Sequence, residues 1–208
     1  MKSQRKSAVP RGRPRAFDAD AALERALQVF WGQGYEGTSL SDLTNATGLS
    51  RPSLYAAFGN KEALFRKALD RYAEQAGRLF RDAVTEPTAR AAVERLLHGA
   101  ADRVTCPGNP QGCLTVRGAL ACGPQADAIR QELALRRAEG EQMLRHRLER
   151  AQAEGELPPG ADPADLARYV ATVYHGMSVQ AAGGASRQAL RRVAELALRA
   201  WPHHAEGD

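Results

Sequence analysis

The stretch that decides the fold is Thr47-Gly48-Leu49-Ser50-Arg51-Pro52-Ser53-Leu54-Tyr55-Ala56-Ala57-Phe58. Ser50 is a favourable helix N-cap, and Pro52 stands in the first turn, where a missing N–H costs no helical hydrogen bond. Ahead of it, Ser39 and Asp42 have the spacing of a capping box, which predicts a second short helix ending at Gly48. Two short helices joined by a four-residue turn predict a helix-turn-helix, in which the later helix reads DNA.

The rest of the chain has helical periodicity, and no segment alternates convincingly as a strand. Beyond the two short helices, the pattern predicts helices over residues 18–34, 61–84, 88–104, 113–121, 125–154, 162–182 and 186–201. We therefore expect an all-α protein of about nine helices. A three-helix DNA-binding head over 16–60 precedes a helical-bundle body for effector binding and dimerisation over 61–208.

Positive charge is concentrated at the N-terminus. The chain has a formal net charge of +5, and six of its 29 basic residues precede Asp18, so the remainder is close to neutral. Within this arm, Pro10-Arg11-Gly12-Arg13-Pro14-Arg15 resembles the core of an AT-hook, in which an extended Arg-Gly-Arg lies along a narrow minor groove. We expect residues 1–15 to be a disordered basic arm that contacts DNA through Arg11, Arg13 and Arg15.

Composition also indicates what the protein is not. No run of 18 apolar residues and no secretory signal is present, so we expect a soluble, cytoplasmic protein with no membrane contact. The three cysteines lack a paired C-x-x-C pattern, and we expect neither a metal nor a cofactor. Catalytic motifs such as H-E-x-x-H and G-x-S-x-G are absent, which argues against an enzyme.

Residues 17–66 resemble the TetR family of bacterial repressors. The resemblance rests on Thr38-Ser39-Leu40, on Gly48-Leu49-Ser50 and on Ser53-Leu54-Tyr55-Ala56-Ala57-Phe58-Gly59-Asn60-Lys61-Glu62-Ala63-Leu64-Phe65. It implies a homodimer with a ligand-binding body. It also implies that Thr38 and Ser39 contact phosphate at the start of the second helix, as do the Tyr55 hydroxyl and Lys61, roles that suit the N–H groups and charge at helix N-termini.

The third helix would read bases through its first exposed residues. We expect Ser50, Arg51, Pro52 and Ser53 at the DNA, with Arg51 able to contact guanine or a phosphate. Many family members carry larger side chains where this chain has Ala56 and Ala57, so the arginine arm is expected to supply more of the binding energy.

The body is expected to hold a small-molecule pocket and a dimer surface. Candidate effector-binding residues, which could equally be plain core, are Phe80, Val104, Leu114, Met143, Tyr174 and Met177. His146 and His175 are read as structural. The last two helices carry wide apolar stripes that predict a four-helix dimer interface, although both could pack within one subunit. The stripes are Leu166, Tyr169, Val170, Val173 and Met177, then Leu190, Val193, Leu196, Ala197 and Ala200.

Besides a small-molecule pocket, a reactive cysteine is a second candidate means of sensing an effector. Gly112-Cys113-Leu114-Thr115-Val116 resembles a segment of electrophile- and oxidant-sensing family members, and a helix N-terminus favours a reactive thiolate. The alternative is that Cys113 and Cys122 are small buried apolar residues. We therefore expect a repressor that a small-molecule or electrophile signal releases from its operator; an architectural protein for AT-rich DNA is the alternative.

Overall fold

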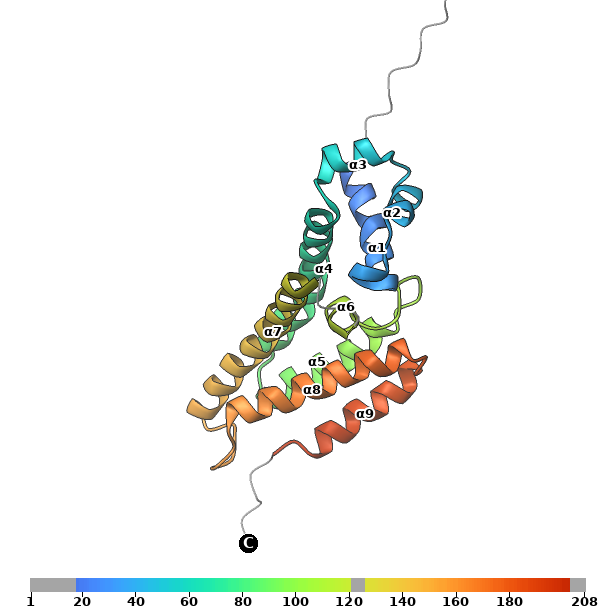
Figure 1. The fold of residues 1–208 in the computed structure, drawn as a ribbon. Coiled ribbons are helices and arrows are strands. Elements are labelled where there is room, and N and C mark those ends of the chain that lie inside the picture. Colours follow the sequence, from blue (N-terminus) through green and yellow to red (C-terminus); the bar gives the residue numbers. More distant parts are fainter. Residues whose placement is uncertain (1–17, 121–125, 203–208) are drawn as a thin grey trace, which may run out of the picture.

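The computed structural model describes residues 18–120 and 126–202, which contain nine α-helices and no strand. Three of them form a small head at one end of the molecule (Figure 1). These helices are α1 (Ala19–Gly37), α2 (Leu40–Thr47) and α3 (Arg51–Phe58). The expected all-α class is confirmed in this part of the chain. The arm with Arg11, Arg13 and Arg15 lies outside the described residues, as does Cys122.

The body contains the other six helices. They are α4 (Lys61–Val84), α5 (Ala89–Val104), α6 (Leu114–Leu120), α7 (Asp127–Ala153), α8 (Pro163–Ala182) and α9 (Arg187–Arg199). Helix α4 runs from the head into the body and packs against α7, while α8 and α9 lie side by side at the far end (Figure 1). None of the helices in the described ranges is long and apolar enough to cross a membrane.

The N-caps predicted at Ser39 and Ser50 are confirmed, and five further helices begin in the same way. Asp18, Ser39, Ser50, Asn60, Thr88, Asp162 and Ser186 each accept a hydrogen bond from a backbone N–H in the first turn of the following helix. Helix α1 departs from expectation because it resumes beyond Gly34. Gly34 itself has non-helical dihedral angles, with φ 75° and ψ 174°, so the first helix is broken there as its glycine predicted.

The buried apolar side chains of the described residues form two clusters. One joins α5, α8 and α9 with the later parts of α4 and α7. The other contains the head core, with Leu27, Phe30 and Trp31 of α1, and also Cys113 and Leu114 at the start of α6. A segment of the body is therefore packed into the same apolar cluster as the head.

Candidate DNA interface and sensor pocket

Helix α3 presents a short polar edge at its N-terminus. The Ser50 hydroxyl accepts a hydrogen bond from the N–H of Ser53 at 3.3 Å and lies 2.9 Å from the Ser53 hydroxyl. Arg51, Pro52 and Ser53 are exposed, whereas Leu54 and Phe58 are buried against the head. Tyr55 is 44% exposed. This division between a buried and an exposed face is the one that the sequence predicted.

The neighbouring elements add polar groups to this end of the molecule. Arg51 Nη2 lies 3.5 Å from Ser41 Oγ on α2, so its side chain is held only loosely. Lys61 Nζ lies 4.6 Å from the centre of the Tyr35 ring, and partial burial lowers its pKa. Ser39 and Asp42 form the expected capping box, and hydrogen bonds from Ser39 lower the pKa of Asp42.

The phosphate contact expected of Thr38 stays a prediction, although the side chain of Thr38 is buried in this conformation. Thr38 is 1% exposed, and its hydroxyl donates a hydrogen bond to the carbonyl oxygen of Gly34 at 2.7 Å. This hydrogen bond connects the start of α2 to the residue at which α1 is broken. Thr38 therefore stabilises the turn into α2.

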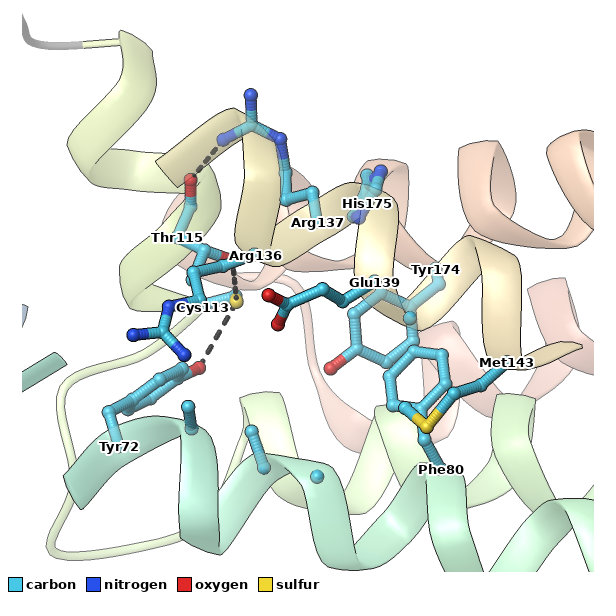
Figure 2. Close-up of a pocket in the computed structure, with 14 residues that line it drawn as sticks. Tyr72, Phe80, Cys113, Thr115, Arg136, Arg137, Glu139, Met143, Tyr174 and His175 are labelled. Atoms are coloured by element: carbon cyan, nitrogen blue, oxygen red, sulfur yellow. Dashed lines mark hydrogen bonds between the residues drawn. The ribbon is translucent and has the colours of Figure 1, made fainter. Parts of the chain in front are cut away.

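A pocket of about 560 Å³, part of it open to solvent, lies among α4, α7 and α8 beside the start of α6 (Figure 2). Its lining residues are Tyr72, Ala73, Ala76, Gly77, Phe80, Cys113, Thr115, Arg136, Arg137, Glu139, Gly140, Met143, Tyr174 and His175. The lining combines apolar side chains with a few polar groups, as small-molecule sites do. Phe80, Met143 and Tyr174 were expected here, and Cys113 joins them.

Three expected effector-binding residues lie elsewhere. Val104 and Met177 are 1% exposed within the α5, α8 and α9 cluster, and Leu114 is fully buried in the cluster that contains the head core. None of the three lines the pocket. Their apolar periodicity reflects packing between helices, which periodicity alone does not distinguish from a ligand wall.

Most of the polar residues that line the pocket were not predicted from the sequence. Arg136, Arg137, Glu139 and His175 face the pocket, although His175 was read as structural. One signal was available: Ala73, Ala76 and Gly77 have helical spacing on α4, and Gly140 lies on α7. An alanine Cβ at Gly140 would stand 3.1 Å from the Phe80 ring, so small residues on these two helices leave the space open.

Cys113 is held at the inner wall of the pocket by three other elements. Tyr72 of α4 donates its hydroxyl hydrogen to Cys113 Sγ at 3.1 Å, and the Thr115 hydroxyl lies 3.1 Å from the same sulfur (Figure 2). The backbone N–H of Cys113 donates to Ser178 Oγ of α8 at 2.7 Å. Cys113 is 3% exposed and immediately precedes α6, as predicted.

Two arginines near Cys113 have no carboxylate within ion-pair distance in the described part of the chain. The Arg103 guanidinium lies 4.6 Å from the centre of the Tyr72 ring. Arg137 donates to the carbonyl oxygen of Thr115 (Figure 2). Burial and the positive charge of Arg137 lower the pKa of His175, so His175 is neutral at neutral pH.

Apolar side chains remain exposed on α8 and α9. Tyr169, Val179, Val193 and Leu196 are between 38% and 57% exposed. By contrast, Val170, Met177, Leu190 and Ala197 from the same predicted stripes are buried inside the subunit. Each stripe is thus wider than the core of one subunit, as expected.

Comparison with known proteins places the chain in a family. Residues 22–68 match the model described as bacterial regulatory proteins, tetR family, and residues 87–197 match the tetracyclin repressor-like C-terminal domain. The HTH-type transcriptional repressor ComR of Escherichia coli is 40% identical over 197 residues, which cover 92% of each chain. The HTH-type transcriptional repressor BdcR of the same species is 30% identical and covers 95% of each.

Solved structures agree with these relatives. A cysteine variant of the TetR family transcriptional regulator CifR, complexed with a 26-bp operator DNA, is 48% identical with a TM-score of 0.87, and the match covers 92% of this chain and 100% of that one. A regulator from Rhodococcus is 43% identical with a TM-score of 0.61 over 88% of this chain and 99% of that one. The chain belongs to the TetR family.

Proposed function

We propose that this protein is a transcriptional repressor that binds operator DNA as a homodimer and leaves the DNA when an effector in the pocket modifies Cys113. Residues at the exposed edge of the head supply the DNA contacts, namely Ser39, Ser50, Arg51, Pro52, Ser53, Tyr55 and Lys61. The basic arm adds Arg11, Arg13 and Arg15. The exposed apolar side chains of α8 and α9 form the dimer surface.

One observation supports a connection between the pocket and the DNA-binding head: the segment Gly112–Leu114 contacts both of them. Cys113 lines the pocket, while the indole N–H of Trp31 on α1 donates to the carbonyl oxygen of Gly112 at 3.1 Å in a buried hydrogen bond. Trp31 also contacts the Tyr72 ring edge to face, with 4.9 Å between ring centres.

Modification of the sulfur must disturb this arrangement. The Tyr72 hydroxyl donates to Cys113 Sγ and accepts from the N–H of Leu114 at 3.3 Å. An added group on the sulfur competes for the space of that hydroxyl, because Cys113 is almost fully buried. Displacement of Tyr72 moves the partner against which Trp31 packs, and so α1 and the head shift relative to the body.

Alkylation of cysteine variants distinguishes release caused by modification of Cys113 from release caused by modification elsewhere in the protein. Wild type, Cys113→Ser and the control Cys106→Ser are treated with N-ethylmaleimide, and binding to a duplex selected by the protein from random-sequence DNA is followed by fluorescence anisotropy. We expect wild type and Cys106→Ser to release the duplex, and Cys113→Ser to retain it. Equal release by Cys113→Ser would refute the role of Cys113, and equal affinity for random competitor DNA would favour an architectural protein.

A further inference from the structure

Tyr174 presents a hydroxyl group to the pocket. Tyr174 is 4% exposed, and its hydroxyl forms no hydrogen bond with any residue in the described ranges. Among the described residues, the fully buried side-chain nitrogen and oxygen atoms without a hydrogen bond belong to Arg147, so the Tyr174 oxygen is accessible from the pocket and free to meet a bound molecule. Figure 2 shows this hydroxyl pointing into the cavity, on the side of Tyr174 that faces Cys113.

The position and ionisation of Tyr174 suit a hydrogen-bond donor. Its ring packs edge to face on Phe80, with 5.4 Å between ring centres, which fixes the direction of the hydroxyl. Burial, with a further contribution from Cys113, raises the pKa of Tyr174 well above its ordinary value. The group therefore keeps its proton at neutral pH and presents an O–H rather than an oxyanion.

We infer that Tyr174 donates a hydrogen bond to an oxygen atom of the effector on which negative charge develops when Cys113 attacks. The inference rests on the proposed role of Cys113 and names the chemical class of its electrophile. That class has a carbonyl conjugated to the attacked carbon. Apolar surface from Phe80 and Met143 surrounds the rest of the molecule.

The addition step balances without an oxidant or another reactant. The thiol proton leaves to solvent, and the sulfur forms a bond to the β-carbon of the conjugated carbonyl. The π electrons of the C=C bond move to give an enolate, whose oxygen accepts the hydrogen bond from Tyr174. A proton from solvent then adds to the α-carbon, so the net change is addition of S–H across the C=C bond.

Two probes distinguish this role from packing. N-ethylmaleimide reacts by conjugate addition, whereas iodoacetamide reacts by displacement of iodide and builds no enolate. Both are applied to the full chain carrying Cys106→Ser and Cys122→Ser, so that Cys113 is the one thiol left. Tyr174→Phe retains the ring and removes only the hydroxyl. Rates are followed by intact-mass spectrometry.

We expect Tyr174→Phe to slow the maleimide reaction by about a hundredfold, by analogy with the loss of one oxyanion donor in enzymes, and to leave the iodoacetamide rate unchanged. Equal slowing of both reactions would show that Tyr174 only shapes the pocket. No change in either would show that the hydroxyl has no role. Each result would overturn the inference.

A second measurement needs no variant at Tyr174. The ratio of the maleimide rate to the iodoacetamide rate is compared between Cys113 and free glutathione, and we expect a larger ratio for Cys113. An equal or smaller ratio would also overturn the inference. These rates are measured without DNA. The rate experiment can therefore contradict the role of Tyr174 while operator release by Cys113 modification still holds, and the release experiment can contradict the role of Cys113 independently of these rates.

Discussion

Gly112 occupies a position where both the backbone conformation and the lack of space for a side chain require glycine. Its φ of 91° lies in the left-handed region, and a Cβ there would stand 2.9 Å from the carbonyl oxygen of Ser178. The absence of a side chain lets the segment before α6 approach α8 closely enough for the N–H of Cys113 to reach Ser178 Oγ. The position of Cys113 therefore depends on the glycine beside it.

We expect Gly112→Ala to lower the free energy of unfolding by about 1–3 kcal/mol, because it adds backbone strain to a clash with a backbone atom. Gly108→Ala is the matched control, since Gly108 has a φ of 86° but open space around its Cβ position. Chemical denaturation measures both variants. A loss no larger for Gly112→Ala than for Gly108→Ala would contradict the importance of the close approach.

Trp31 of α1 donates a hydrogen bond directly to the segment Gly112–Leu114. Trp31→Phe keeps an aromatic ring in the cluster and removes the N–H that Gly112 accepts. We expect Cys113 to react with N-ethylmaleimide at the wild-type rate, while the alkylated protein stays on DNA longer than alkylated wild type. Mass spectrometry and anisotropy measure the two effects, with Trp201→Phe as the control. Unchanged release would mean that the signal reaches the head by another route.

At the scale of single elements, α3 is a short helix whose reading edge carries one charged side chain. Arg51 is exposed and weakly held, so it is free to take a base or phosphate. We expect Arg51→Ala to weaken operator binding by about 1–3 kcal/mol if it contacts guanine. Arg78→Ala, an exposed arginine on α4, removes the same charge and should change affinity little. Anisotropy titrations at several salt concentrations check this, and equal effects of the two substitutions would exclude a specific role for Arg51.

A buried arginine of α7 forms hydrogen bonds with neighbouring segments of the body. The side chain of Arg147 is 1% exposed and donates to the carbonyl oxygens of Glu86 and Pro87 and to Glu156. Burial pushes the pKa of Glu156 upward, but hydrogen bonds from the Ala89 N–H and Arg147 outweigh it and hold the pKa below its usual value. The carboxylate form is thus favoured by folding.

A depressed pKa in the folded state gives stability that is present above the unfolded value of about 4.5 and is lost as pH falls through the folded value. We expect Arg147→Met to reduce the dependence of unfolding free energy on pH below about pH 4.5, because Glu156 loses its charged partner. Arg145→Met, on the exposed face of α7, is the control. Thermal unfolding measured from pH 3 to 7 would refute this if both variants kept the wild-type slope.

At the scale of the whole molecule, α8 and α9 present apolar side chains that no other described element covers. Burial of such side chains between two copies would favour a dimer, and a two-fold dimer would match two operator half-sites. The surface lies at the opposite end of the molecule from α3 (Figure 1). The distance between the two heads would then be set by the body.

We expect Leu196→Lys to convert the protein to a monomer and to abolish tight operator binding. Leu196 is 57% exposed on α9, and a lysine there would place like charges in the two-fold interface. Leu135→Lys is the matched control, because Leu135 is 65% exposed and belongs to α7 rather than to α8 or α9. Sedimentation velocity distinguishes the outcomes. A dimeric Leu196→Lys protein would place the interface elsewhere.

The helices and the helix-turn-helix could be predicted from the sequence, because capping residues, glycines and apolar periodicity act over one to four positions along the chain. The sequence also singled out Cys113 from its place at the start of α6. The lining of the pocket became known from the packing of the helices: Val104 and Met177 belong to the core, whereas Arg137 and His175 line the cavity. The packing also buried Thr38 and joined Trp31 to Gly112 across 81 positions. Such contacts depend on how helices pack against one another, and helical spacing fixes a residue's face without fixing what that face meets.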